Sequence, residues 1–463
     1  MTIHASTHAS RREFIKRAAA LSASGVAAPF AFNLAALGEA AAANATGYKA
    51  LVCVFLYGGN DYANTVAPYD SVSHALYLAQ RPLVGLARDS LAGTVLDPTL
   101  PLAGGRQYAL APELSGLVPL FNSGRMGVLL NIGTLVQPTT KAQYAAKSVP
   151  LPPKLFSHND QQSVWQSSSP EGSRSGWGGR MGDLFAAANG NATFTCVSAA
   201  GNAVFLSGQS AVQYQVTSNG SVPLSALQTP LFGSSACSDA LRSLVTAPRT
   251  HLFESEHARI MKRSIEADTQ LRSALAGSTP LATALPAGNS LAGQLGMVAR
   301  MIAARSNLGA KRQVFFVSLG GFDTHNGLVE DHPVLMGQVG PALEAFQAAM
   351  EELGVADQVT TFTASDFGRT LTSDGDGSDH GWGSMHFVLG GAVRGNAFYG
   401  MPPVIANNGP DDVGQGRLLP SMSVDQFGAT LGRWFGVSDI ELSTVMPNLA
   451  NYSLRDLGFL AAG

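Results

Sequence analysis

The sequence carries little charge. Of its 463 residues, 13% are Asp, Glu, Lys or Arg, and 29 basic residues nearly balance 32 acidic ones. Soluble domains usually contain about 25% charged residues, and nucleic-acid-binding domains concentrate Lys and Arg on one face. The sparse, balanced charge therefore excludes a protein that binds nucleic acid through bulk positive charge.

Cysteine is also scarce. Three cysteines are too few for the disulfide framework of a small secreted domain. Cys53 lies within an apolar run, so we expect a buried thiol there. Cys196 and Cys237 could pair in an oxidising compartment, and the sequence leaves both the paired and the free state open.

Long apolar runs are missing after the first fifty residues. No later stretch reaches the roughly 18 uninterrupted apolar residues that a membrane-spanning helix needs. Hydrophobic residues nevertheless make up 45% of the chain, which is too many for a disordered protein. With 51 glycines and 24 prolines, the chain is expected to be a large, loop-rich globular protein.

The first 45 residues are typical of an export signal. Arg11 and Arg12 precede a weakly apolar stretch of small residues over 18–37, and an Ala-rich segment follows. A basic start, an apolar middle and an Ala-x-Ala end indicate a secretory signal, and the paired arginines indicate the twin-arginine type. We predict a signal peptide over 1–45, a passing contact with the twin-arginine translocase, and a periplasmic or secreted mature protein without a stable membrane span. An N-terminal amphipathic helix or membrane anchor is the alternative.

Short apolar runs that end near Gly, Ser, Asn or Asp indicate strands. Continuous runs without strict alternation are typical of strands buried on both faces of a parallel sheet. Helical periodicity over 290–306 and 340–353 lies between some of them, which predicts βαβ units. We expect a single α/β domain over 46–463, with a largely parallel central sheet flanked by helices. The runs are Ala50 to Tyr57, Met126 to Ile132, Thr193 to Ser198, Val314 to Leu319, Val359 to Thr363 and Phe387 to Leu389.

Residues 134–250 differ from the rest of the chain. They are rich in Ser, Gly, Asn, Gln and Pro and show few helical periods. We expect a loop-rich insert or cap on the sheet. Since no period of 20 to 50 residues repeats, a solenoid or propeller is disfavoured.

Polar side chains that bind metals follow several of the apolar runs. Open α/β sheets bind ligands beyond the carboxyl ends of their strands, and carboxylate oxygens and imidazole nitrogens together can hold one cation. The same residues are also ordinary turn or capping residues. Asp379 and His386 either orient a ligand or belong to turns. The candidate ligands are Asp61, Asp323, His325, Asp366 and His380.

Ser157 precedes a polar stretch that can form a helix. On local grounds it is an N-cap, the commoner role for such a serine. It is alternatively a nucleophile at a helix N-terminus, where the dipole favours an anionic substrate. His158 belongs to the same segment.

The order of these motifs resembles the alkaline-phosphatase superfamily, which includes sulfatases, phosphodiesterases and cofactor-independent phosphoglycerate mutases. More closely, the whole mature chain is identified as a member of a bacterial export family known as domain of unknown function 1501. The motifs that carry this resemblance are Gly58-Gly59-Asn60-Asp61, Ser157-His158, Ser175-Gly176-Trp177, Gly321-Phe322-Asp323-Thr324-His325, Ser365 to Thr370, Asp379-His380-Gly381-Trp382-Gly383 and Leu431 to Val437.

The resemblance implies an alkaline-phosphatase-like fold and a divalent metal. Asp61 would bind one ion, Asp323 and His325 the other, and Asp366 and His380 would complete the ligand set, with Ser157 as the nucleophile. Arg369 or, less favoured, Arg180 would neutralise substrate charge through paired hydrogen bonds.

Two departures from the relatives weaken the second metal site. Phe367 stands where the two-zinc enzymes have a ligating His, and Asp323 and His325 lie two residues apart rather than four. That site is therefore expected to be weak, oxygen-rich or missing.

These patterns lead us to expect an exported metal-dependent hydrolase of phosphate or sulfate esters. Its substrate would be a small-molecule or polymer ester, and its ion zinc, calcium, magnesium or manganese, with no nucleic-acid partner. The alternative is a non-catalytic envelope protein that keeps the fold and binds a metal or ligand. An oxidoreductase with an organic cofactor ranks last, because no Gly-x-Gly-x-x-Gly follows the first strand and no cysteine cluster could hold iron–sulfur.

Overall fold

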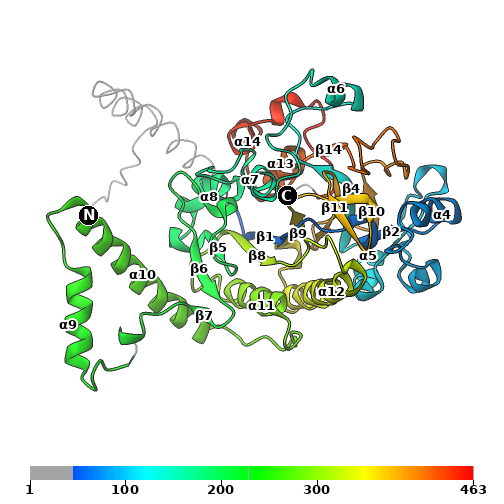
Figure 1. The fold of residues 1–463 in the computed structure, drawn as a ribbon. Coiled ribbons are helices and arrows are strands. Elements are labelled where there is room, and N and C mark those ends of the chain that lie inside the picture. Colours follow the sequence, from blue (N-terminus) through cyan, green and yellow to red (C-terminus); the bar gives the residue numbers. More distant parts are fainter. Residues whose placement is uncertain (1–44, 228, 462–463) are drawn as a thin grey trace, which may run out of the picture.

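The computed structural model describes residues 45–227 and 229–461, so the predicted signal peptide over 1–45 lies, but for its last residue, outside the described residues. A central sheet dominates the molecule (Figure 1). Its strands, in spatial order, are β13 (Ala397–Tyr399), β4 (Met126–Gly133), β12 (Ser384–Leu389), β9 (Val359–Ser365), β1 (Lys49–Leu56), β8 (Arg312–Leu319), β5 (Cys196–Ser198), β6 (Tyr214–Thr217) and β7 (Gly220–Ser221).

Most neighbouring strands of the sheet are parallel. β1 pairs in parallel with β8 on one side and β9 on the other, β5 pairs in parallel with β8 and β6, and β13 and β14 (Met422–Ser423) pair in parallel with β4. β12 is antiparallel to both of its neighbours, and β7 is antiparallel to β6. The prediction of a largely parallel α/β sheet is confirmed, and each of the six apolar runs lies at a strand of this sheet.

Helices cover both faces of the sheet, and β1 shows why. Val52 and Val54 pack into the core on one face, whereas Leu51, Cys53 and Phe55 pack into the core on the other. The continuous apolar run of β1 thus serves two layers. One layer contains α5 (Leu117–Asn122), α11 (Ser290–Ala303) and α12 (Leu328–Glu352), and the other contains α7 (His158–Ser167), α8 (Trp177–Phe185), α13 (Val424–Phe435) and α14 (Asp439–Val445) (Figure 1).

Small elements surround the sheet. They are α3 (Tyr62–Thr65), α4 (Ser71–Gln80), α6 (Lys141–Ala146), the β2–β3 pair (Val66–Pro68 and Tyr108–Leu110) and the β10–β11 hairpin (Arg369–Asp374 and Gly377–His380). Cys53 and Cys196 are buried, Cys237 is exposed, and all three are free thiols, so the Cys196–Cys237 pair is not formed.

Residues 134–250 are more regular than their composition indicated. The stretch contains α6, α7 and α8, and it contributes β5 and β6 to the central sheet. It therefore supplies part of the sheet and of its helical cover in addition to loops. The organisation of 46–463 as a single domain stays a prediction.

The end of this stretch and the helix that follows it extend away from the sheet. The helices α9 (Ser235–Thr246) and α10 (Leu252–Ala276) form a helical hairpin that projects beyond β6 and β7 (Figure 1). We call α9, α10 and the residues that join them the helical arm. Among the described helices of the whole chain, none combines the length and apolarity that crossing a bilayer requires.

Candidate metal centre

The carboxyl ends of three neighbouring strands form the base of the candidate site. β8, β1 and β9 lie side by side and run in parallel, so the residues that follow Leu319, Leu56 and Ser365 emerge at one edge of the sheet. We call this the carboxyl edge. Gly58 lets two of these exits approach each other, because a Cβ there would lie 2.4 Å from the backbone nitrogen of Asp323, and its φ is +117°.

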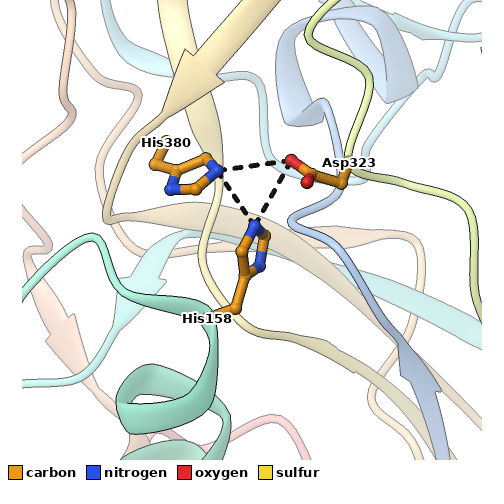
Figure 2. Close-up of side chains that lie close together, drawn as sticks. All are labelled: His158, Asp323 and His380. Carbon is orange, nitrogen blue, oxygen red and sulfur yellow. Dashed lines mark hydrogen bonds and ion pairs between the residues drawn. The ribbon is translucent and has the colours of Figure 1, made fainter.

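Three histidines and one carboxylate converge at the carboxyl edge. The Nε2 atom of His380 lies 2.9 Å from Nε2 of His158 and 2.9 Å from Nε2 of His325. Oδ1 of Asp323 lies 3.1 Å from Nε2 of His325 and 3.3 Å from Nε2 of both His158 and His380. Figure 2 shows His158, Asp323 and His380 pointing toward one another. We call His158, Asp323, His325 and His380 the His–Asp cluster.

Hydrogen bonds on the far side of two rings fix which nitrogen faces the cluster. Nδ1 of His158 lies 2.6 Å from Oδ2 of Asp366, and Nδ1 of His380 lies 2.7 Å from the carbonyl oxygen of Phe156. Both partners only accept, so each neutral ring carries its proton on Nδ1. Two Nε2 lone pairs then face each other across 2.9 Å, an arrangement that needs a proton or a cation between them.

The pKa values of the two rings differ in the expected way. The hydrogen bond to Asp366 raises the pKa of His158 above its ordinary value, and partial burial opposes it. Partial burial lowers the pKa of His380, and the hydrogen bond to Phe156 offsets only part of this. In the metal-free protein the shared proton therefore belongs to His158, and a bound cation would displace it.

Within the described residues, two groups could hold a metal ion. They are His158, Asp323 and His380, and His325, Asp379 and His380. Both groups contain His380, so they adjoin each other at that ring. The outer side of the cluster faces solvent, since the side chains of Asp323 and His325 are 46% and 44% exposed.

Arg369 lies beneath the cluster, not on its open side. Its guanidinium is fully buried, and Nη1 donates to Oδ1 of Asp323 at 2.7 Å and to the carbonyl of Gly58 at 3.0 Å. Burial alone would raise the pKa of Asp323, but the hydrogen bond from Arg369 and the neighbouring charges outweigh it and lower that pKa. The geometry favours a positioning role for Arg369 toward Asp323 over direct contact with a substrate.

Asp61 is the predicted ligand that the structure sets apart from the histidines. Its buried carboxylate forms an ion pair with buried Arg81 and accepts hydrogen bonds from the amide of Asn64 at 3.0 Å and from Oγ of Ser378 at 3.1 Å. Burial would raise the pKa of Asp61, but the charge of Arg81 reverses the shift and lowers it. Asp61 thus caps α3 and neutralises Arg81.

Asp366 joins the site through His158. Besides that ring, its Oδ2 accepts hydrogen bonds from Nε2 of Gln162 at 2.8 Å and from the amide of Gly58 at 3.2 Å. Its Oδ1 is buried without a donor among the described residues. Phe367, next along the chain, packs its ring 4.9 Å from the rings of both His158 and His380 and so supplies apolar contact area beside the cluster.

Ser157 lies at the N-cap of α7, beside His158. Its hydroxyl donates to Oδ2 of Asp160 at 3.1 Å. His158 is the cluster residue absent from the predicted ligand set. The Ser-His pair itself could have indicated it. Histidine is a commoner metal ligand than serine, and His158 is the first residue of α7, at the end of the helix that faces the cluster.

Of the remaining polar residues that the sequence singled out, only Asp379 lies beside the cluster. Asp379 lies 4.0 Å from Nδ1 of His325 and is paired with Arg417 at 3.3 Å. His386 lies apart from the cluster, buried in β12, with Nδ1 3.3 Å from Oγ1 of Thr363. Arg180 also lies elsewhere, where it donates to the carbonyls of Val445 and Ser167.

A search of curated proteins gives no match to the sequence. Solved structures similar to this chain include the sulfatase PsFucS1 from Pseudoalteromonas sp., which is 10% identical, with 93% of this chain and 76% of that chain covered and a TM-score of 0.34. A protein of glycosaminoglycan metabolism from Bacteroides thetaiotaomicron is also 10% identical, with 86% of this chain and 75% of that chain covered and a TM-score of 0.34. Similarities at this level of identity do not establish an activity for this chain. Residues 109–447 match the family described as Protein of unknown function (DUF1501), and the chain therefore belongs to that family.

Proposed function

We propose that this protein is an exported metal-dependent hydrolase of phosphate or sulfate esters. The observation that supports it most directly is the convergence of His158, His325 and His380 on Asp323. The four ligand atoms lie 2.9 to 3.3 Å from their neighbours in the cluster. A tetrahedral ion with bonds of about 2.0 Å would space its ligands by about 3.3 Å. His158, Asp323 and His380, whose mutual distances are all 2.9 to 3.3 Å, therefore fit three ligand positions of one divalent ion.

The donor atoms favour zinc over the other ions expected. Two imidazole nitrogens and one carboxylate oxygen suit zinc and similar transition metals, whereas calcium and magnesium prefer sets made entirely of oxygen. Asp366, Phe156 and Arg369 hold His158, His380 and Asp323, respectively, in place from behind. Such supporting hydrogen bonds orient ligands and strengthen metal binding.

Ser157 is the nucleophile in this proposal. A divalent ion at the cluster would act as a Lewis acid on the ester group. The hydroxyl of Ser157 already donates to Asp160, whose carboxylate is buried and lies 3.4 Å from Nζ of Lys154. Asp160 can accept the hydroxyl proton as the serine oxygen bonds to phosphorus or sulfur and the alcohol oxygen leaves. Water would then release the group from Ser157.

One observation favours a second candidate, a non-catalytic metal-binding protein. His158, Asp323 and His380 would hold one ion, and His325, which lies 2.9 Å from His380 and 3.1 Å from Asp323, stands beside the fourth position. Metal sites closed by four protein ligands are usually structural, whereas catalytic zinc sites keep one position for water or substrate. In this case His325, the most exposed of the three histidines, would not give way to substrate.

Elemental analysis and an ester screen distinguish the two candidates. We expect about one zinc ion per mature chain, and turnover of a phosphate monoester, phosphate diester or sulfate ester that disappears with the ion. His380→Ala should lose both, whereas His257→Ala, an exposed histidine on α10, should keep both. Ion binding without turnover of any ester supports the second candidate. Full zinc occupancy in His380→Ala would remove the site altogether.

A further inference from the structure

Arg417 connects the His–Asp cluster to the chain around it, although the proposed reaction gives it no part. Its Nε donates to the main-chain carbonyl of His380 at 2.9 Å, and its Nη2 donates to Oδ2 of Asp379 at 3.3 Å. The other oxygen of Asp379, Oδ1, accepts from the main-chain N–H of His380 at 2.7 Å. Arg417 and Asp379 together therefore hold both main-chain polar groups of His380.

The same guanidinium covers the ring of Phe156. Its central carbon lies 4.4 Å from the centre of that ring, within the range of a cation–π contact. The carbonyl oxygen of Phe156 lies 2.7 Å from Nδ1 of His380 and so fixes which ring nitrogen faces the cluster. One side chain thus supports His380 twice, directly at its main chain and, through Phe156, at its ring.

The backbone of Phe156 depends on such support. Its φ is +72°, in the left-handed region that bulky residues rarely adopt. A conformation of this kind persists only where neighbouring contacts hold it. Arg417 stacks on one face of the ring, and the ring of Trp382 lies edge-on with 6.5 Å between the ring centres. Loss of Arg417 would therefore leave the Phe156 carbonyl less firmly aimed at Nδ1 of His380.

The loop that carries Arg417 is packed tightly against the β10–β11 hairpin. Gly416 has a φ of +75°, and a Cβ there would lie 2.7 Å from the backbone nitrogen of Thr372. The carbonyl of Gly416 also accepts from the amide of Leu371 at 2.8 Å. Because His380 is the last residue of this hairpin, the close approach fixes Arg417 beside it.

The geometry favours positioning over contact with a substrate. The side chain of Arg417 is only 21% exposed, its Nε and Nη2 donate to the protein, and Phe156 covers one face. A guanidinium can use its flat face and its fork of donors together, which an ammonium cannot. We propose that Arg417 is a positioning residue of the metal centre and keeps Nε2 of His380 aimed at the ion. This inference rests on the ion-binding part of the proposed function and not on which ester is hydrolysed.

Cobalt(II) in place of zinc gives a readout of ligand geometry in the full mature chain, because its visible absorption depends on how its ligands are arranged. Arg417→Ala should change the spectrum of bound cobalt and weaken zinc binding by about 10- to 100-fold, as the loss of a supporting contact does. Arg417→Lys should behave like Arg417→Ala, because lysine lacks the flat fork. A role in stability alone would lower the unfolding temperature and leave the cobalt spectrum unchanged.

A second variant tests the contact through Phe156. Phe156→Leu removes the aromatic face but keeps the carbonyl, so zinc binding should weaken by a smaller factor than in Arg417→Ala. In the Phe156→Leu background, Arg417→Ala should then weaken binding less than it does in the parent, because part of its effect is already lost. Arg433→Ala is the matched control, since Arg433 is also partly exposed and pairs with Asp439 at 2.6 Å on the surface. It should keep the parental zinc affinity and cobalt spectrum.

The proposal is overturned if Arg417→Ala binds zinc with parental affinity and gives the parental cobalt spectrum. Where Arg417→Ala does not fold, the same result in Phe156→Leu overturns it. A parent that binds neither zinc nor cobalt contradicts the metal centre and this inference together. Ion binding that weakens in Arg417→Ala, without turnover of any ester by the parent, supports the positioning role and contradicts only the hydrolase.

Discussion

Nδ1 of His158 lies 2.6 Å from Oδ2 of Asp366, although the two residues are 208 positions apart in the sequence. This contact turns the Nε2 lone pair of His158 toward His380 and Asp323. It also stabilises the protonated ring when no ion is present. In the proposed metal site the same carboxylate would therefore support a proton and a metal ion in turn, and this competition can be measured.

Asp366→Asn should weaken zinc binding by about 10- to 100-fold while leaving the fold intact, because the amide orients His158 but no longer makes it more basic. Competition with a chromophoric chelator gives the affinity. Asp374→Asn, an exposed carboxylate on the β10–β11 hairpin, is the matched control and should bind zinc like the parent. Equal zinc affinity in Asp366→Asn and the parent would show that Asp366 does not support the ligand.

Zinc binding should release protons below neutral pH. The pKa of His158 is raised, so its ring is protonated in the metal-free protein at pH values where an ordinary histidine is neutral. Since only the neutral ring can bind, zinc affinity should fall as pH drops through that pKa, by up to about tenfold per pH unit. Calorimetry in buffers of different ionisation enthalpy counts the protons. Release should be smaller in His158→Ala, and an unchanged count would contradict the assignment.

Ser157→Ala should lower kcat by at least about a hundredfold while zinc content stays unchanged, because the hydroxyl is the proposed nucleophile and no cluster distance depends on it. Steady-state kinetics on the ester that gives turnover, together with elemental analysis, test this. Ser163→Ala is the control, since Ser163 lies on the same helix and its hydroxyl donates to the carbonyl of Pro170. Turnover by Ser157→Ala at the parent rate would assign the attack to water.

Two histidines away from the cluster should make the fold sensitive to acid. Complete burial lowers the pKa of His332 to about 4 and that of His386 to about 3. The unfolded chain, with histidine pKa values near 6.5, binds more protons than the folded chain between these limits. The free energy of unfolding should therefore fall as pH drops below about 6.5, by up to about 1.4 kcal/mol per pH unit for each histidine.

Urea unfolding at a series of pH values measures this slope. His386→Gln should reduce it by the share of one proton, whereas His257→Gln should leave it unchanged because His257 is exposed. A slope that is identical in the parent and in His386→Gln would show that His386 does not titrate on unfolding.

The central sheet was predictable because burial on both faces leaves a direct trace in the sequence. β1, β8 and β9 are continuous apolar runs, and the polar residues after Leu319 and Ser365 mark their exits. Parallel neighbours place these exits at one edge, so the meeting of Asp323, Asp366 and the two predicted histidines followed from the strand pattern.

Helices that gain their stability from tertiary contacts were harder to predict. α12 begins at Leu328, whereas the sequence predicted a start near residue 340. Pro333 and Pro341 lie inside the helix and argue against it in the sequence, but packing against α11 stabilises it. α7 is too polar to show a helical period. α8 contains Gly179, where a Cβ would lie 2.1 Å from the backbone of Ser207. The glycine permits this close packing, but it also lowers the helix propensity of the segment, so the sequence did not predict α8.

Within the candidate site, the sequence indicated ligand residues but not the partners that tertiary contacts give them. Residue type and place at a strand exit indicated Asp323, His325 and His380. The sequence offered no sign that Asp61 would form an ion pair with Arg81, since that residue follows the end of α4 and the pair is fully buried. The environment of Arg369 was likewise set by a tertiary contact, its hydrogen bond to Asp323.

The cluster also fixes when the site can first exist. His158 and His380 stand 222 positions apart, and Asp323 comes from a third segment. During synthesis, His158, Asp323 and His380 cannot come together until the β10–β11 hairpin, which ends at His380, has left the ribosome and packed beside the residues that follow β8. If the cluster binds the proposed ion, fragments that stop before this hairpin should contain no metal, even where their first strands have paired.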